Sequence, residues 1–117
     1  MIDAKAKELG RLVGQSPEYQ AVKRASDALN DDKETVTLLQ KMEQLRVSAQ
    51  RMMQRGDRPT EEMERELDTL LGQIQGRPTY QRLVVAQENF DKVMARVNDW
   101  ILEGMEKGAA SPIITLG

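Results

Sequence analysis

Apolar residues recur three and four positions apart along most of this chain, which is the spacing of one face of an α-helix. The first two stripes are Ile2, Ala6, Leu9 and Val13, and then Tyr19, Val22, Ala25 and Leu29. Between them stands Ser16, and the residue before a proline is driven out of the helical region. Ser16 can also cap the next helix, with Pro17 at its first position. The pattern therefore predicts helices over about residues 3–15 and 17–29, with a break at 30–32.

The next stripe predicts a longer helix over about residues 33–55. Its apolar positions alternate four and three residues apart, as in the seam of a coiled coil. They are Leu38, Met42, Leu45, Ala49 and Met52. At 1.5 Å per residue such a helix is roughly 35 Å long. The sequence Gly-Asp-Arg-Pro at 56–59 then ends it, because glycine and proline both favour turns.

Two further helices are predicted after this turn. Thr60 is a good N-cap, and Glu61 and Glu62 stand where the helix dipole favours acidic side chains. The stripe of the fourth helix is Met63, Leu67, Leu70 and Ile74, with Gly76 at its end. The fifth helix is expected over about residues 78–105, with its seam at Leu83, Ala86, Phe90, Val93, Val97 and Trp100. Residues 108–117 have no helical period, so we expect a mobile tail that either stays disordered or docks on a partner.

The predicted helices make one all-α domain over residues 1–107, followed by a flexible tail at 108–117. We expect two short N-terminal helices and then a long antiparallel helical hairpin, in a bundle-like arrangement. Such a hairpin buries little by itself, so a homo-oligomer is expected, with a dimer favoured. The residues expected in the structural or oligomer seam are Leu38, Met42, Leu45, Leu67, Leu70, Ile74, Phe90, Val97 and Trp100.

Two of the predicted helices begin alike. Residues 16–29 read SPEYQAVKRASDAL and residues 77–90 read RPTYQRLVVAQENF, at a constant offset of 61 positions. Pro, Tyr and Gln coincide, and apolar residues follow at matching places. This likeness fits an internal duplication, although a proline in the first turn of an amphipathic helix also recurs for physical reasons alone. The sequence leaves both explanations open.

Composition narrows the chemistry that this chain can perform. It has no His and no Cys, which removes thiol nucleophiles, imidazole acid–base groups and the usual zinc and iron–sulfur ligands. We therefore expect no enzyme activity, no cofactor and no metal. The net charge of −2 differs from the basic character of nucleic-acid-binding domains, so we do not expect this chain to bind nucleic acid directly. The first ten residues contain no apolar signal segment and no apolar run could span a membrane, so a cytoplasmic protein is expected.

The turn at 56–59 gathers the candidates for partner binding, which are Arg51, Met52, Met53, Arg55, Arg58 and Met63. Methionine side chains suit irregular partner surfaces. Alternatively, Met52 and Met63 simply close the core at the turn, which leaves Met53 as the exposed contact. The arginines either touch RNA or are neutralised by the acidic start of the following helix. Neutralisation is favoured, because no aromatic stacking residues accompany them.

Three stretches carry a family likeness. They are AKELGRLVGQSPEYQAVKRASDAL at 6–29, MMQRGDRPTEEMERELDTL at 52–70 and RPTYQRLVVAQENFDKVMARVNDWI at 77–101. In order and spacing they resemble the bacterial YlbF/YmcA family, also called control-of-competence regulators, which includes the YheA-like proteins. The resemblance covers nearly the whole chain except the tail.

This resemblance implies an all-helical, cytoplasmic, non-catalytic protein that assembles through its helices and acts as a regulatory adaptor. The best-known members join a complex linked to the endoribonuclease RNase Y, and so to RNA processing, competence, sporulation and biofilm development. Some members carry C-terminal cysteines associated with iron–sulfur clusters. The tail GAASPIITLG has no cysteine, so no cluster is expected in this chain.

Overall fold

The computed structural model describes residues 1–110, which form five α-helices and no strand. They are α1 (Ile2–Gly14), α2 (Pro17–Asp31), α3 (Lys33–Gln54), α4 (Glu61–Gln75) and α5 (Pro78–Ala110). The predicted helices are therefore confirmed, and most boundaries agree within two residues. The exception is α5, which continues to Ala110 and so makes the first part of the expected tail helical. The rest of that tail prediction falls at 111–117, outside the described residues.

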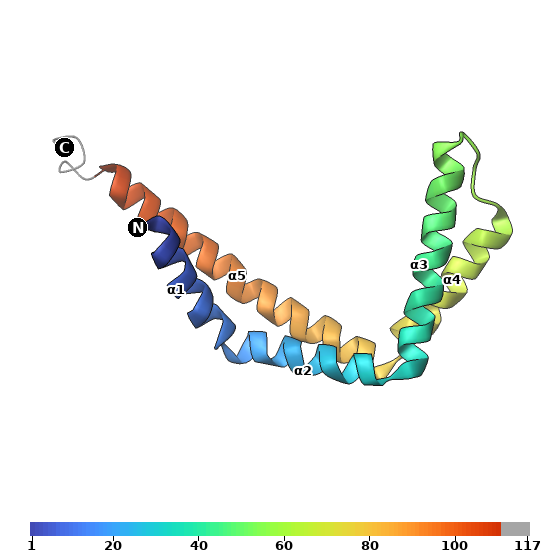
Figure 1. The fold of residues 1–117 in the computed structure, drawn as a ribbon, viewed down its shortest axis with the longest axis horizontal. Helices are drawn as coiled ribbons and strands as arrows, with labels where there is room; N and C mark the ends of the chain where they lie inside the picture. Colours follow the sequence, from blue (N-terminus) through green and yellow to red (C-terminus); the bar gives the residue numbers. More distant parts are fainter. Residues whose placement is uncertain (111–117) are drawn as a thin grey trace.

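The helices form an arch rather than the expected bundle (Figure 1). α3 and α4 pair as an antiparallel hairpin at one end, while α5 packs against α2 and continues beside α1 to the other end. The described part measures 66 × 37 × 19 Å. A helix with its side chains is about 10–12 Å across, so the thinnest dimension holds only two helices. The expected long hairpin is thus replaced by two helix pairs, α3 with α4 and α2 with α5. The reason is that α5 starts where α4 ends and then packs against α2 instead of α3.

The buried core is small and divided in the same way. Its apolar side chains are Ala25 and Leu29 of α2, Leu70 and Ile74 of α4, and Ala86 and Val97 of α5. Within the α2–α5 pair, the ring centroids of Tyr19 and Phe90 lie 5.3 Å apart. A thin arch leaves one side of each helix pair open, so most other apolar stripe residues are only half-buried.

Most of the predicted seam residues face the core, with one clear difference. Leu70, Ile74 and Val97 are buried, as the seam prediction requires. The half-buried members are Leu38, Met42, Leu45, Leu67 and Phe90. Trp100, however, is 61% exposed. It lies on the part of α5 beyond α2, where only the short α1 runs alongside, so no helix of this chain covers it.

The two similar helix starts have the same local structure. In the α1–α2 turn, the Gln20 side chain donates to the backbone carbonyl of Gly14 at 2.9 Å. In the α4–α5 turn, Gln81 donates to the carbonyl of Gln75 at 2.8 Å. Three backbone hydrogen bonds of the first turn recur in the second at the same offset, whereas the bond from the Gln15 N–H to Leu12 has no counterpart there. They differ at the capping position, where the second turn has Arg77 in place of the serine whose side chain caps α2.

The turn between α3 and α4 ends one helix and starts the next. The backbone N–H of Gly56 donates to Met53 at 3.0 Å, and that of Asp57 donates to Met52 at 2.9 Å. These are the two bonds of a Schellman motif, and Gly56 has the positive φ of 87° that this motif needs. Thr60 then caps α4, as predicted, by accepting a hydrogen bond from the Met63 N–H at 3.1 Å.

Replacing Gly56 with alanine is expected to destabilise the protein by about 1–2 kcal/mol, because an L side chain in the left-handed region is strained. A Cβ at Gly56 would meet no atom within 4 Å, so the cost is conformational and not a clash. Gly72 is the matched control, since it lies inside α4 and a Cβ there is also uncrowded. Alanine at Gly72 should stabilise the helix by about 0.5–1 kcal/mol. Urea unfolding followed by circular dichroism measures both, and shifts of the same sign would contradict the assigned turn.

Candidate functional site

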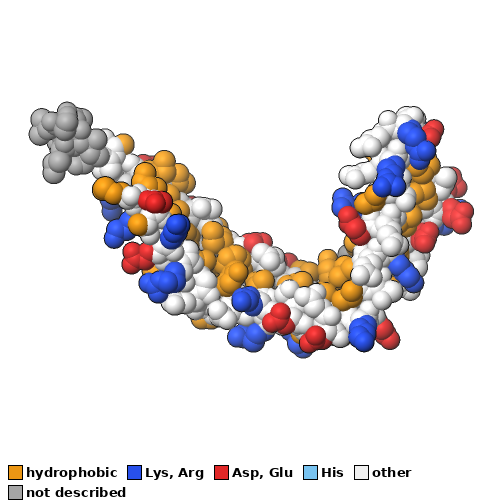
Figure 2. Space-filling model, in the orientation of Figure 1, with side chains coloured by type: hydrophobic (Ala, Val, Ile, Leu, Met, Phe, Trp, Pro, Cys, Tyr) orange, Lys and Arg blue, Asp and Glu red, His pale blue; other side chains and the backbone are white. Residues whose placement is uncertain are grey.

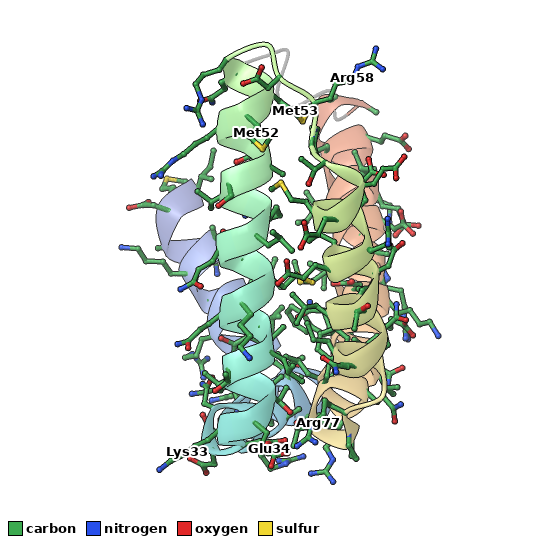
Figure 3. The ribbon with its side chains drawn as sticks, turned by 90° about the vertical axis from the view of Figure 1, so that its right-hand side faces the viewer. Lys33, Glu34, Met52, Met53, Arg58 and Arg77 are labelled. Carbon is green, nitrogen blue, oxygen red and sulfur yellow. The ribbon has the colours of Figure 1, made fainter. Side chains whose placement is uncertain are left out.

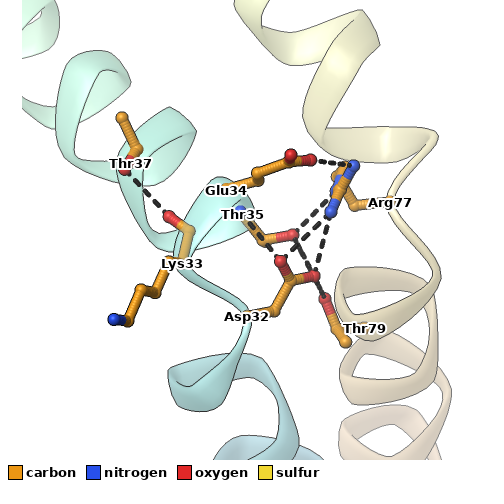
Figure 4. A network of polar contacts seen from close by, with 7 residues as sticks. All are labelled: Asp32, Lys33, Glu34, Thr35, Thr37, Arg77 and Thr79. Atoms are coloured by element: carbon orange, nitrogen blue, oxygen red, sulfur yellow. Dashed lines mark hydrogen bonds and ion pairs between the residues drawn. The ribbon is translucent and has the colours of Figure 1, made fainter.

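The bend of the arch, here called the elbow, is held by a cluster of polar side chains (Figure 4). Asp32 caps the start of α3, and Arg77 lies between α4 and α5. The Nη2 of Arg77 donates to Asp32 Oδ1 at 3.1 Å, and its Nε donates to Thr35 Oγ1 at 2.9 Å. Its Nη1 pairs with Glu34 Oε2 at 3.0 Å. We call this cluster, completed by Thr79, the polar clasp.

The polar clasp is saturated with hydrogen bonds. Asp32 Oδ2 accepts from the hydroxyl of Thr35 at 2.7 Å and from that of Thr79 at 2.8 Å. Thr35 is fully buried, and in residues 1–110 no buried side-chain nitrogen or oxygen lacks a hydrogen-bond partner. A group that acts as a base or nucleophile needs an accessible lone pair. The arrangement instead suits a structural role, since it ties together two junctions that are far apart in the sequence.

The clasp makes stability depend on pH through Asp32. Hydrogen bonds from the hydroxyls of Thr35 and Thr79, with a further one from Arg77, hold the pKa of the Asp32 carboxyl well below its usual range. A lowered folded pKa stabilises the protein above the unfolded value of about 3.9, and this contribution is lost as the pH falls further. We therefore expect the stability difference between wild type and Asp32→Asn to be largest near neutral pH and to shrink below about pH 4.

Urea titrations at several pH values measure that difference. Asp68→Asn serves as the control, because Asp68 is an exposed acid in α4. A difference for Asp32→Asn that stays constant from about pH 6 to about pH 3 would show that the ionised carboxylate does not support the elbow.

The sequence pattern did not reveal the clasp. The apolar pattern predicts only a helix break at 30–32, and it places Arg77 only at the start of the second similar segment. Two local signals were present: a threonine three positions after the capping Asp32, and an arginine at the capping position before Pro78, where it cannot cap. Neither signal says that the two junctions meet, because that depends on how the helix pairs are arranged.

The hairpin tip carries the predicted partner-binding residues (Figure 3). Met53 is 63% exposed, whereas Met52 and Met63 are half-buried between the ends of the two helices. Met52 and Met63 thus help to close the hairpin, which leaves Met53 as the methionine available for contact. Arg51, Arg55 and Arg58 are exposed at the same end of the hairpin.

The expected neutralisation of these arginines by α4 is wrong for the described residues. Arg46 pairs with Glu43 of its own helix at 2.6 Å, and Arg65 pairs with Glu61 of its own helix at 3.7 Å. Within residues 1–110, no ion pair joins α3 to α4. Side chains three or four positions apart on one helix reach each other easily, whereas the charged faces of α3 and α4 point outward. The three exposed arginines at the tip, Arg51, Arg55 and Arg58, therefore have no ion pair in the described part of the chain.

The described residues lack two further features. They contain no cluster of three or more acidic side chains arranged to hold a metal ion. None of the helices up to residue 110 combines the length and apolarity needed to cross a lipid bilayer.

Comparison with known sequences identifies relatives. The family model described as "Control of competence regulator ComK, YlbF/YmcA" matches residues 2–106. A UPF0342 protein of Limosilactobacillus reuteri is 27% identical over 96 residues, covering 82% of this chain and 78% of that protein. The UPF0342 protein SAG1376 of Streptococcus agalactiae is 32% identical over 96 residues, covering 76% of this chain and 86% of that protein.

A solved structure shows the same fold. The protein of unknown function (DUF964) from Bacillus stearothermophilus superposes with a TM-score of 0.66, covering 95% of this chain and 97% of that one. Its sequence is only 16% identical, so this likeness concerns the fold alone. The family match is independent of it and spans almost all of the described residues. The chain therefore belongs to the YlbF/YmcA family, which is named for control of the competence regulator ComK.

Proposed function

We propose that this chain is a non-catalytic regulatory adaptor that binds a partner protein through the tip of its α3–α4 hairpin. The observation that carries the proposal is an exposed methionine, Met53, at a hairpin end that also exposes three arginines without ion pairs in the described part, Arg51, Arg55 and Arg58. A flexible apolar side chain at the same helix end as exposed arginines suits a partner that offers an apolar pocket with acidic residues nearby. Membership of a family named for regulation supports the same role.

The biological setting of the proposal comes from the family. Its best-known members work in a complex linked to RNase Y. We therefore include RNase Y-dependent RNA processing, with its effects on competence, sporulation or biofilm control, as the setting in which the adaptor acts. The partner is expected to be a protein of that system.

A second candidate function is an RNA-associated module that uses a stripe of arginines toward the end of α3, namely Arg46, Arg51 and Arg55. The missing ion pairs between α3 and α4 favour it, because unpaired arginines can bind phosphates. The aromatic residues of the chain weigh against it. Tyr19, Tyr80, Phe90 and Trp100 all lie on α2 and α5, so no base-stacking residue stands at the tip.

A tagged pull-down from host lysate, with and without ribonuclease and analysed by mass spectrometry, tests the two functions. Wild type is compared with a tip variant that combines Met53→Ser, Arg51→Ala and Arg55→Ala. The matched control is Arg24→Ala with Arg82→Ala, two exposed arginines on α2 and α5, away from the tip. We expect a defined set of proteins that survives ribonuclease, persists in the control and is lost with the tip variant.

Three results would contradict the adaptor proposal. If ribonuclease removes the recovered proteins, RNA binding becomes the favoured function. A steep salt dependence of RNA binding to the purified chain would then confirm it. Equal recovery with the tip variant and wild type would remove the tip as the binding site. Loss with the control variant would show a non-specific effect of charge.

A further inference from the structure

The hairpin tip exposes one apolar side chain that can be oxidised, the thioether of Met53. It is 63% exposed, and it is the only exposed large apolar residue between residues 20 and 70. Figure 2 shows basic side chains at this free end of the hairpin, whereas hydrophobic side chains gather mainly along the rest of the arch. An apolar contact between the tip and a partner therefore depends on this one thioether.

The three methionines of the tip differ in accessibility. Met52 and Met63 are half-buried between the ends of α3 and α4, where they help to close the hairpin. Oxidation of a sulfur-containing side chain by a dissolved oxidant follows its exposure. A peroxide therefore reaches Met53 first, and the other two methionines are internal references at the same end of the molecule.

The composition of the chain leaves methionine as its reversible redox group. The chain has no cysteine, so no thiol can be oxidised and then reduced again. Methionine, by contrast, is oxidised to a sulfoxide that dedicated reductases convert back to the thioether. If the activity of this protein responds to peroxide and recovers, the response has to act through a thioether.

We infer that Met53 is a site of reversible oxidation by hydrogen peroxide, and that its sulfoxide abolishes partner binding by the hairpin tip. This inference rests on the proposed adaptor function and adds its regulation. The thioether sulfur takes one oxygen atom from the peroxide as the O–O bond breaks, and the other oxygen leaves as water with both hydrogens. The sulfur loses two electrons, which the peroxide gains. A dithiol-dependent reductase reverses the step, in which the dithiol becomes a disulfide and the sulfoxide oxygen leaves as water.

The sulfoxide changes the contact surface while the helices remain intact. It converts a flexible apolar side chain into a polar one. An apolar pocket of the partner would then have to enclose a polar oxygen without a hydrogen-bond donor, so the affinity should fall about tenfold or more. The local backbone does not depend on the thioether, because the turn uses the Met53 carbonyl, which accepts from the Gly56 N–H at 3.0 Å.

Oxidation of the purified full chain by hydrogen peroxide tests the site first. Tandem mass spectrometry resolves the adjacent Met52 and Met53. We expect the sulfoxide of Met53 to form at least about threefold faster than those of Met52 and Met63, with unchanged helical circular dichroism. Equal rates at the three methionines, or a loss of helix as Met53 reacts, would overturn the inference.

The effect on binding is measured with the oxidised chain as bait in the ribonuclease-treated pull-down. Catalase first removes the peroxide, and the lysate is desalted so that its reductases lack their cofactors. Met53→Leu keeps an apolar side chain of similar volume without the sulfur. The matched control is Met105→Leu, which removes an exposed thioether from the far end of α5. Oxidation should remove the proteins recovered by wild type and by Met105→Leu, but not those recovered by Met53→Leu.

Two further treatments separate the sulfoxide from other oxidative damage. Methionine sulfoxide reductase with dithiothreitol should restore recovery by the oxidised wild type. Met53→Gln, which places a polar group at the same position, should lose the proteins without any peroxide. Retention by oxidised wild type or by Met53→Gln, loss with oxidised Met53→Leu, or failure of the reductase to restore recovery would each overturn the inference.

The proposed adaptor function fails on a different comparison, which involves no peroxide. It is contradicted when the untreated tip variant recovers the same proteins as untreated wild type. The oxidation inference alone is contradicted when the untreated tip variant loses those proteins and the oxidised wild type keeps them.

Discussion

An Ile74→Ala variant is expected to lose about 2–5 kcal/mol of its free energy of unfolding. Ile74 is the largest side chain with no exposed surface, and it lies in a fold only two helices thick. Removing three carbon atoms there leaves a cavity that rigid helix pairs fill poorly. For a small domain whose total stability is on the order of 5–15 kcal/mol, this loss reaches a large share of the whole.

Leu71→Ala is the control for this prediction. Leu71 lies on the same helix but is 40% exposed, so its truncation should cost no more than about 1 kcal/mol. Urea titrations followed by circular dichroism measure both variants, at one protein concentration because self-association would add to apparent stability. Equal losses at the two positions would mean that α4 does not bury the face assigned to it.

The helices themselves could be predicted because their signals are local. Ser16 and Thr60 accept the capping hydrogen bonds expected of them, and Gly56 provides the left-handed residue that ends α3. Each of these features depends on residues within one or two turns of helix. The apolar stripes likewise predicted which side of α4 is buried, as Leu70 and Ile74 confirm.

The arrangement of the helices could not be predicted, because it depends on pairing between distant segments. The stripe on α5 is equally suited to packing against α3 or against α2, and only the direction of the chain after Arg77 decides between them. That direction is held by the bond from Arg77 to Asp32, 45 positions away. The exposure of Trp100 follows from the same choice, since α5 extends beyond the end of α2.

The arch separates the hairpin tip from the other end of the molecule. The tip lies at one end and the free ends of α1 and α5 lie at the other, with the elbow between them (Figure 1). The polar clasp then has a mechanical role, because it sets the direction in which the tip points relative to α1 and the far end of α5.

Replacing Thr35 with valine should cost about 1–3 kcal/mol, because it removes a buried hydroxyl from the middle of the clasp. Valine keeps the branched shape and nearly the volume of threonine, so the loss reports on hydrogen bonding. The Thr35 hydroxyl donates to Asp32 at 2.7 Å and accepts from the Nε of Arg77 at 2.9 Å. Without it, a charged donor loses its partner at a site where Thr35 has no contact with solvent.

Thr37→Val is the matched control, two residues further along α3. Its hydroxyl bonds only to the backbone carbonyl of Lys33 at 2.8 Å, and the residue is exposed, so the change should stay within about 0.5 kcal/mol. Spin labels at Met53 and Glu103 would add a second measurement, because a weakened elbow should broaden the distribution of distances between the two ends of the arch. Equal stabilities for the two valine variants, with an unchanged distance distribution, would mean that helix packing alone fixes the bend. The polar clasp would then contribute nothing to the direction of the hairpin.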